Sequence, residues 1–455
     1  MTSFSIPQEV SELFNLFEQT ECQLYLVGGA VRDTLLGKMV YDWDLTTDAP
    51  PEKILEILKD KDAYYNNQFG TVGIPSEEYH PHEITTFRSE VGYSDNRRPD
   101  NVIWGKTIEE DLQRRDFTIN AIAARKVKNE EFKLIDPFNG QKDLKEKLIR
   151  TVGDPNERFA EDALRLVRAV RFAAELSFKI ESDTLNAIKQ NAPKINSISK
   201  ERVRDELFKI IASNNAYHGM ELFRESGLMQ EVLPELEKTF GVEQKSPGRH
   251  HIYDVGTHSL NALKEVPSTD VITRFATLIH DIGKPQTFKI LENGTITFYN
   301  HEIVGASIAK NIAERLKFSR KDAGKLIRLV RWHQFTVSED QTDKAIRRFI
   351  TNVSPEYIED MLALRTGDRL GGGASETSWR LEDFKKRLIE VQKQPFTVRD
   401  LKISGTDVMQ VLNIKPSPKV GKILNNLFNE VVENNLSNER EVLITQLKSL
   451  HPQGS

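Results

Sequence analysis

The stretch that decides the fold is LYLVGGAVRDTLLGKMVYDWDL, residues 24–45. Residues 23–27 predict a strand, Ala30–Leu36 predict a helix that ends at Gly37, and residues 42–45 predict a second strand. Gly28 and Gly29 lie between the first strand and the helix. Glycine there lets the backbone approach a phosphate closely, and the helix N-terminus offers free N–H groups. A glycine pair alone is a weak signal of phosphate binding.

Two carboxylates follow the glycines. Asp42 and Asp44 are two residues apart, so on a strand both side chains point to the same face. Two carboxylates on one face can hold two divalent cations, and paired metal ions activate a hydroxyl nucleophile and stabilise a pyrophosphate leaving group. Taken alone, such a pair is more often a solvated strand edge.

The rest of the first 150 residues alternates short strands and helices. Helices are predicted at 7–20 and 52–60, and strands at 70–74, 82–88, 119–127 and 132–135. From about residue 154 the apolar residues recur at a helical period. We therefore predict an α+β protein, a small mixed-sheet head followed by helical segments. The predicted segments are 1–150, 151–245, 250–370 and 371–451.

Composition narrows the class of protein. Of the 455 residues, 38% are hydrophobic and 29% charged, as is typical of a globular protein. No apolar run approaches the ~18 residues that cross a bilayer, and the N-terminus lacks the features of a signal peptide. The single cysteine, Cys22, excludes an internal disulfide and a multi-cysteine zinc site. We expect a cytoplasmic protein without a membrane partner. Its net charge of −5 implies that any nucleic acid binds to local basic surfaces.

Six motifs follow one another in order. They are GGAVRD, DWDLTT, ITTFR, RRDFTINAIA, DPFNG and EDALRLVRAVRF. This series, over about residues 23–235, resembles the class II tRNA nucleotidyltransferases, which add CCA to tRNA 3′ ends, and the bacterial poly(A) polymerases. The resemblance implies a polymerase-beta-like head, tRNA as partner, CTP and ATP as substrates, and Mg²⁺ as cofactor.

The resemblance also implies roles for residues of the head. Asp42 and Asp44 would be catalytic and bind magnesium, and Gly28, Gly29 and Arg32 would hold the triphosphate. Asp116 and Asn120 would recognise the ribose. Glu83 is either a third acidic partner or one half of a structural salt bridge. Arg114 and Arg115 have the charge for triphosphate contact, although one of them could instead pair with Glu109, Glu110 or Asp111.

Glu161, Asp162, Arg165 and Arg168 are predicted to bind the nucleotide. Asp162 and Arg165 are three positions apart on a predicted helix, so they share a face. A carboxylate accepts from an exocyclic amino group, whereas a guanidinium donates to a ring nitrogen or carbonyl. Cytosine and adenine fit this pair, while uracil and guanine would present a carbonyl to the carboxylate. By resemblance, Glu161 orients the arginine. The alternative is a helix-surface ion pair.

Two further segments resemble parts of the same enzymes. The polar loop SEVGYSDNRRPDN, residues 89–101, resembles the flexible loop with which complete CCA-adding enzymes switch from C to A. DPFNG at 136–140 resembles a hinge, with Gly140 supplying flexibility.

A second set of residues is typical of a metal site. A His-Asp dipeptide, His280-Asp281, follows an apolar run, and imidazoles and carboxylates on separate helices suit a divalent metal. Residues 250–370 resemble the HD phosphohydrolase superfamily. The resemblance implies four ligands to a divalent metal of unknown identity: His258, His280, Asp281 and Asp368. Lys284, His301 and His333 would contact phosphate or hold a second metal.

Basic residues recur at helical spacing between 320 and 348, and they either line an RNA-facing surface or form a solvated face. They are Arg320, Lys321, Lys325, Arg328, Arg331, Lys344, Arg347 and Arg348. KPSPKVGKILNNLF near the end predicts a turn followed by a helix, and resembles the family's tRNA-gripping segment.

The function expected from these motifs is template-independent CCA addition, with a phosphohydrolase that repairs 3′ ends. The alternatives are an A-adding enzyme or poly(A) polymerase, or an HD phosphohydrolase whose N-terminal half binds RNA.

Overall fold

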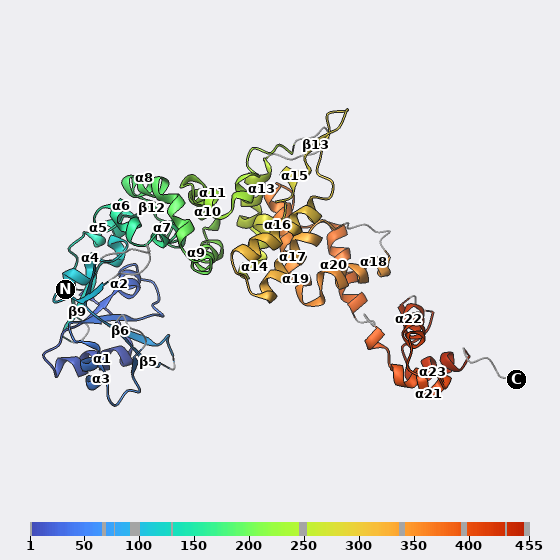
Figure 1. Cartoon of the computed structure of the whole chain (residues 1–455), viewed down its shortest axis with the longest axis horizontal. Coiled ribbons are helices and arrows are strands. Elements are labelled where there is room, and N and C mark those ends of the chain that lie inside the picture. Colours follow the sequence, from blue (N-terminus) through green and yellow to red (C-terminus); the bar gives the residue numbers. More distant parts are fainter. Residues whose placement is uncertain are drawn as a thin grey trace. The chain divides into compact units, whose positions relative to one another are not determined.

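The computed structural model describes residues 2–65, 70–76, 78–91, 101–128, 131–244, 253–335, 342–392, 398–432 and 435–449. The chain forms two compact units (Figure 1). The first comprises Met1–Gly241 together with Asn311–Ser319, and the second comprises Val242–Lys310 and Arg320–Ser455. Among the described residues, no helix is both long enough and apolar enough to span a membrane. The prediction of four separate segments stays a prediction.

The first unit begins with an eight-stranded mixed sheet of order β1-β10-β9-β2-β3-β6-β5-β4. Its strands are β1 (Thr2–Ser3), β2 (Leu24–Val27), β3 (Asp44–Thr47), β4 (Tyr64–Tyr65), β5 (Thr71–Ile74), β6 (His82–Thr86), β9 (Ala123–Lys128) and β10 (Glu131–Ile135). Only β3 and β6 run parallel; the other neighbours are antiparallel. A hairpin, β7 (Arg88–Val91) and β8 (Asn101–Trp104), follows β6. The predicted α+β class is confirmed.

Helices cover the two faces of this sheet. The helices of the head are α1 (Gln8–Glu18), α2 (Gly28–Leu35), α3 (Pro51–Ile57), α4 (Ile108–Gln113) and α5 (Gly140–Glu146). Phe14 of α1 packs edge-on against Phe132 of β10, with ring centroids 5.7 Å apart. Ile108 and Leu112 of α4 join a buried cluster with Tyr25 of β2. The sheet is therefore anchored to α1 on one face, and its other face carries α4.

The remainder of the first unit is mainly helical. Its elements are β11 (Leu148–Ile149), α6 (Pro155–Glu161), α7 (Leu164–Leu176), β12 (Lys179–Ile180), α8 (Ser182–Asn191), α9 (Lys200–Ala212), α10 (Ala216–Glu225), α11 (Leu228–Val232) and α12 (Pro234–Glu237). Nine residues of α7 are buried, which gives this helix a central place in the packing.

The second unit is built from helices with one short hairpin. Its elements are α13 (Val255–Glu265), α14 (Val271–Ile279), α15 (Lys284–Thr287), β13 (Lys289–Ile290), β14 (Ile296–Thr297), α16 (His301–Arg315, whose last turn belongs to the first unit), α17 (Arg320–Trp332), α18 (Asp343–Val353), α19 (Ile358–Gly371) and α20 (Trp379–Gln392). Three further helices, α21 (Gly405–Leu412), α22 (Pro418–Val432) and α23 (Arg440–Ser449), share an apolar cluster centred on Val408, Leu443 and Leu447. The predicted turn before 418 is followed by α22, as expected.

Several sequence predictions need correction. The strand predicted at 119–127 begins only at Ala123, because Thr118–Asn120 form a 3-10 turn. The side chain of Asp116 stabilises this turn by accepting from the Phe117 N–H and from the Asn120 amide.

The predicted strands at 70–74, 82–88 and 132–135 correspond to β5, β6 and β10.

Gly140 packs closely against Thr118, and its predicted role in a hinge stays a prediction. A Cβ added at this position would lie 2.2 Å from the backbone oxygen of Thr118. Asp136 accepts from the N–H groups of Gly140 and Gln141, at 2.6 and 2.9 Å, and thereby caps α5. The residue therefore holds α5 against the turn that carries Asn120.

We expect Gly140→Ala to lower the free energy of unfolding by about 2 kcal/mol, because the extra methyl group would overpack this contact. Gly324→Ala is the matched control, since a Cβ there meets nothing within 4 Å. It lies inside α17 and should be neutral or stabilising by up to about 1 kcal/mol. Denaturant unfolding of both variants measures the difference, and equal stability of the two would contradict the packing role.

Candidate functional site

The turn after β2 brings three predicted residues together. Gly28 has a φ of +66°, a conformation that favours glycine, and it opens α2. A Cβ on Gly28 would lie 3.1 Å from an Nη atom of Arg115 and 3.4 Å from Oδ2 of Asp44. The glycine, the carboxylate and the guanidinium therefore line one site at the end of β2.

Asp44 sits among like charges. It is the first residue of β3, and its backbone pairs in parallel register with that of Glu83 on β6. Burial, together with the nearby Asp42 carboxylate, raises the pKa of Asp44 to about 6. Arg115 opposes this shift but does not cancel it. The ionised form of Asp44 is therefore disfavoured by burial and by its acidic neighbour, and a cation bound there would stabilise it.

The prediction that Asp42 lies on the strand is wrong. Asp42 is exposed and precedes β3, while Trp43 between the two carboxylates is buried. The pairing of β3 with β2 ends at Leu45, opposite Leu26, because β2 turns into α2 at Gly28. Asp42 has no strand partner beyond that point. Its carboxylate nonetheless acts on Asp44 electrostatically.

The predicted ribose-binding pair belongs to a continuous polar network. Arg32 donates to Oδ1 of Asn120 at 2.8 Å, and the amide of Asn120 donates to Asp116 at 3.2 Å. Arg168 donates to the other oxygen of Asp116 from Nε at 2.8 Å, and its Nη2 lies 2.6 Å away. Burial alone would raise the pKa of Asp116, but Arg168 outweighs it and lowers that pKa to about 2. Asp116 is thus held ionised.

The two neighbouring arginines, Arg114 and Arg115, share one buried acid. Asp111 of α4 is fully buried, and the guanidinium groups lie 2.7 and 3.2 Å from its carboxylate oxygens. Against the cost of burial, they hold the pKa of Asp111 below its usual value. Both arginines therefore make the structural pairing that the sequence left open, and Arg115 also faces Gly28.

Arg165 is held from several sides. Its Nη1 lies 2.5 Å from Oε2 of Glu161 and also donates to the carbonyl of Arg158. Its Nη2 donates to the carbonyl of Arg114 at 2.9 Å. These contacts fix the orientation of the guanidinium. Glu161 lies where the predicted orienting residue would have to lie.

The expectation that Asp162 and Arg165 share the face of a single helix is wrong. Helix α6 ends at Glu161 and α7 begins at Leu164, and Asp162 between them has an extended backbone. Its Oδ1 accepts from the Leu164 N–H at 2.9 Å, while Oδ2 lies 2.9 Å from Nη2 of Arg202 on α9. Because a short polar side chain can bond the N–H groups that open a helix, Asp162 favours a break at this position.

A buried glutamate links these arginines to α9, and sequence reasoning missed it. Glu206 is 3.0 Å from Nε of Arg171, 3.5 Å from Nζ of Lys209 and 4.0 Å from Nη1 of Arg168. The guanidinium groups of Arg32, Arg168 and Arg171 also lie 4.1–5.2 Å from the ring centroid of Phe172. The only available signal was an acidic residue on the apolar side of the periodic segment ERVRDELFKII.

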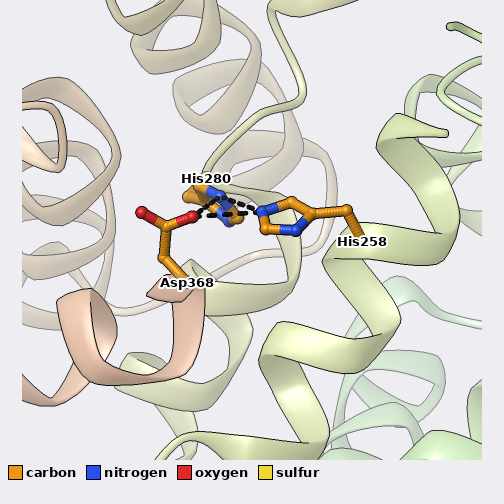
Figure 2. Close-up of side chains that lie close together, drawn as sticks. All are labelled: His258, His280 and Asp368. Atoms are coloured by element: carbon orange, nitrogen blue, oxygen red, sulfur yellow. Dashed lines mark hydrogen bonds and ion pairs between the residues drawn. The ribbon is translucent and has the colours of Figure 1, made fainter. Parts of the chain in front are cut away.

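The second unit contains a separate cluster of imidazoles and carboxylates. Figure 2 shows His258 of α13, His280 at the end of α14 and Asp368 of α19 pointing toward one another. His258 Nε2 lies 3.3 Å from Nε2 of His280 and 3.1 Å from Oδ1 of Asp368. The structure thus gathers residues that are 110 positions apart in the chain.

A second triad, Asp281, His301 and His333, lies beside the first. His301, the first residue of α16, and His333, directly after α17, approach each other with Nε2 atoms 3.2 Å apart. Oδ1 of Asp281 is 3.3 Å from Nε2 of His301, whereas Oδ2 is 3.2 Å from Nε2 of His280. One carboxylate therefore faces both groups of ligands.

The donor set fits divalent metal ions. The Nδ1 atoms of His280, His301 and His333 lie 2.7–2.8 Å from the backbone oxygens of Thr277, Phe298 and Val330. An Nδ1–H that donates to a carbonyl leaves the Nε2 lone pair directed into the cluster, as metal-binding histidines require. Each of the two triads places its ligand atoms within 4.8 Å of one another.

Positive charge compensates the cluster from within the protein. Although burial opposes it, the carboxylates of Asp281 and Asp368 raise the pKa of His280 to about 10. A proton on His280 thus balances the carboxylates, and a metal ion bound there would displace it.

An open cleft of about 440 Å³ gives access to this cluster. Lys284 lies 2.6 Å from Oδ2 of Asp281, and Arg365, which sequence reasoning missed, lies 3.2 Å from Oδ2 of Asp368. Both cations line the cleft, as do Gln244 and Phe298. The cleft therefore offers phosphate-binding charge beside the ligands.

The structure bears on two further segments predicted from sequence, the basic residues between 320 and 348 and the loop at 89–101. Lys325 pairs with Asp270 and Asp360, at 2.8 and 2.7 Å, and Arg347 is buried, so these two do not line an RNA-facing surface. The loop at 89–101 lies mostly outside the described residues, since its positions 92–100 do, including Arg97, Arg98 and Asp100.

Three family models match different parts of the chain. Residues 24–150 match the family model described as the poly A polymerase head domain. Residues 177–240 match one described as an RNA and SrmB- binding site of polymerase A, and residues 303–447 match one for tRNA nucleotidyltransferase domain 2. The CCA-adding enzyme of Ligilactobacillus salivarius is 33% identical over 98% of both chains.

The chain belongs to the family of poly(A) polymerases and CCA-adding enzymes. The A-adding tRNA nucleotidyltransferase of Deinococcus radiodurans is also similar, at 35% identity over 88% of this chain and 89% of that one. A crystal structure of the Bacillus stearothermophilus CCA-adding enzyme in complex with CTP superposes with a TM-score of 0.71. It covers 97% of both chains at 27% identity.

Glu206 forms ion pairs with Arg168, Arg171 and Lys209, so we expect its substitution to destabilise the first unit. Glu206→Gln should lower the stability of the first unit by about 3 kcal/mol, because it removes the charge that compensates buried Arg171. Calorimetric unfolding measures the effect. Glu201→Gln, on the exposed side of α9, is the control and should unfold like the wild type. An unchanged unfolding transition in Glu206→Gln would refute this stabilising role of Glu206.

Proposed function

We propose that this protein adds CCA to tRNA 3′ ends from CTP and ATP without a nucleic-acid template. The observation that carries the proposal is the convergence of Gly28, Asp44 and Arg115 at the end of β2. A half-buried carboxylate, a positive-φ glycine and a guanidinium at one point suit the reacting end of a nucleoside triphosphate. The relatives named CCA-adding enzymes support the choice of reaction.

In the proposed reaction, Asp42 and Asp44 hold magnesium ions. Such ions, when bound, lower the pKa of the attacking 3′ hydroxyl and stabilise the pyrophosphate leaving group. Asp44 is suited to this task because burial, and after it the Asp42 carboxylate, raises its pKa, so a bound cation would stabilise its ionised form. Arg32 and Arg115 supply positive charge on the side where the triphosphate would lie. Asp116, held ionised by Arg168, can accept a hydrogen bond from a ribose hydroxyl.

Base selection is proposed to depend on Asp162 and Arg165. The guanidinium of Arg165 is oriented by Glu161, and the carboxylate of Asp162 is held at the break between α6 and α7. A carboxylate acceptor and a guanidinium donor in fixed positions complement the edges of cytosine and adenine. This geometry supports selection by side chains on adjoining segments rather than on one helix face.

The specificity is tested with transcripts of one tRNA that end at the discriminator base, at +C or at +CC. Each receives magnesium with CTP, ATP or both, and products are resolved at single-nucleotide length. Addition of CCA to the bare end, followed by arrest, is the expected result. Extension of the +CC end alone would instead assign an A-adding enzyme, which the Deinococcus relative makes a specific alternative. A long A ladder would assign a poly(A) polymerase.

We further propose that the cluster in the second unit is a metal-dependent phosphohydrolase site that acts on RNA 3′ ends. His258, His280 and Asp368 would hold one divalent ion, His301 and His333 a second, and Asp281 would contact both. Metal ions bound there would activate water for attack on a phosphoester. Lys284 and Arg365 lie beside the carboxylate ligands, where they can contact phosphate oxygens.

The two proposed sites should be separable by mutation. We expect Asp42→Ala to lower nucleotide addition by more than about a hundredfold while phosphohydrolysis persists, because it removes a metal ligand from one site only. Asp281→Ala should do the reverse. Both activities are assayed on each folded variant, and metal content after dialysis is measured by mass spectrometry. Loss of both activities in either variant would contradict the two-site proposal, as would full metal content in Asp281→Ala.

Arg165→Ala should relax base choice, because it removes the donor to cytosine and adenine. Incorporation of UMP or GMP relative to CMP should rise by about tenfold or more. Arg224→Ala, which removes an arginine paired with Glu237 elsewhere in the same unit, is the control. Single-nucleotide incorporation with each triphosphate measures the ratio. Selectivity equal to that of the control would refute the role of Arg165.

A further inference from the structure

A second cleft lies on the head, away from Gly28. It has a volume of about 330 Å³. Its lining is mainly polar, and the buried residues Tyr25, Phe87 and Ile108 also contribute to it. Three cations line it from three different segments: Lys106 before α4, Arg125 on β9 and Lys133 on β10. None of the proposed reaction steps uses these residues.

Arg125 and Lys133 repel each other unless a counterion lies between them. Arg125 and Lys133 are direct partners in the antiparallel register of β9 and β10. Like charges directly opposite each other on neighbouring strands repel and destabilise the pair. Throughout the part of the chain that the structure describes, neither residue forms an ion pair, and neither does Lys106. Glu109 is the single carboxylate that lines the cleft. An anion bound between the cations would relieve the repulsion.

The position of the cleft connects it to the catalytic face. Tyr25 pairs in register with Thr46, which is two residues from Asp44 on β3, so Tyr25, Thr46 and Asp44 face the same side of the sheet. Phe87 directly precedes the β7–β8 hairpin, and Lys106 closely follows it. A ligand in the cleft would therefore touch the base of this hairpin on the face that carries the catalytic carboxylates.

We propose that this cleft binds a nucleotide through its phosphate, which contacts Lys106, Arg125 and Lys133. The cleft is several times larger than a bare phosphate ion, so it has room for a nucleoside beside the phosphate. The phosphate comes either from the RNA strand that leads to the catalytic site or from a free nucleotide. The RNA source rests on the proposed function, whereas the binding of a free nucleotide does not.

The test compares the full-length wild type with Arg125→Gln, Lys133→Gln and the control Lys128→Gln, which removes a charge from the exposed end of β9 outside the cleft. Calorimetric titration with CMP measures free-nucleotide binding. Fluorescence anisotropy of an end-labelled tRNA transcript, repeated at several salt concentrations, measures RNA binding. Any CMP that binds elsewhere is common to all four proteins, so the differences report on the cleft.

We expect Arg125→Gln and Lys133→Gln to weaken one of the two ligands by about tenfold, because each removes a charged contact to phosphate. If RNA is the source, the slope of log affinity against log salt should also become shallower by about one. Loss of CMP binding with unchanged RNA binding would assign the free nucleotide. Behaviour like that of Lys128→Gln in both assays would overturn the inference.

Thermal unfolding guards against a merely structural effect. Without ligand, both variants should unfold at the same temperature as the wild type or higher, because each removes a like-charge repulsion. A lower unfolding temperature in both variants would show that the cations support the fold, and would overturn the proposal. Failure of CCA addition by the wild type would refute the proposed function and leave the CMP titration as an independent test.

Discussion

A carboxylate taken out of water needs positive charge beside it, and this constraint arranges both sites of the protein. The protein supplies that charge unevenly. Asp116 receives the guanidinium of Arg168, and its pKa falls to about 2. Asp44 lies among carboxylates with too little compensation, and its pKa rises to about 6. The fold therefore pairs the ionised Asp116 with a cation, whereas the charge of Asp44 would be better balanced by a bound ligand.

The arginines around Asp116 show how far such pairing extends. Arg168 connects Asp116 to Glu206, and Asn120 connects Asp116 to Arg32. The guanidinium groups of Arg32 and Arg168 both lie beside the ring of Phe172. Since the members come from α2, the 3-10 turn, α7 and α9, the network ties the sheet domain to the helices that follow it. The same contacts that stabilise the first unit therefore orient the residues expected to meet the nucleotide.

In the second unit the same constraint is met differently. Asp281 and Asp368 are compensated by a raised pKa on His280 and by Lys284 and Arg365. The Nδ1 atoms of three histidines are bound to backbone oxygens, so their Nε2 atoms converge. The second unit thus compensates its carboxylates with a proton and two cations, whereas Arg115 is the cation that lies against Gly28 and Asp44 in the first unit.

Sequence alone was sufficient for the α+β class, because that class depends on local periodicity, and the resemblance of its motifs to known families selected most residues of the two candidate sites. It predicted Asp44, Asp116 and the six histidine and aspartate residues of the second cluster by position. It did not predict that Asp42 precedes its strand, that Asp162 breaks a helix, or that Gly140 serves close packing. Glu206, Arg365 and the facing pair Arg125 and Lys133 were likewise invisible. Each of these depends on which distant segments meet, and only the tertiary structure decides that, because a residue's partners across a sheet or between helices are not encoded in its neighbours along the chain.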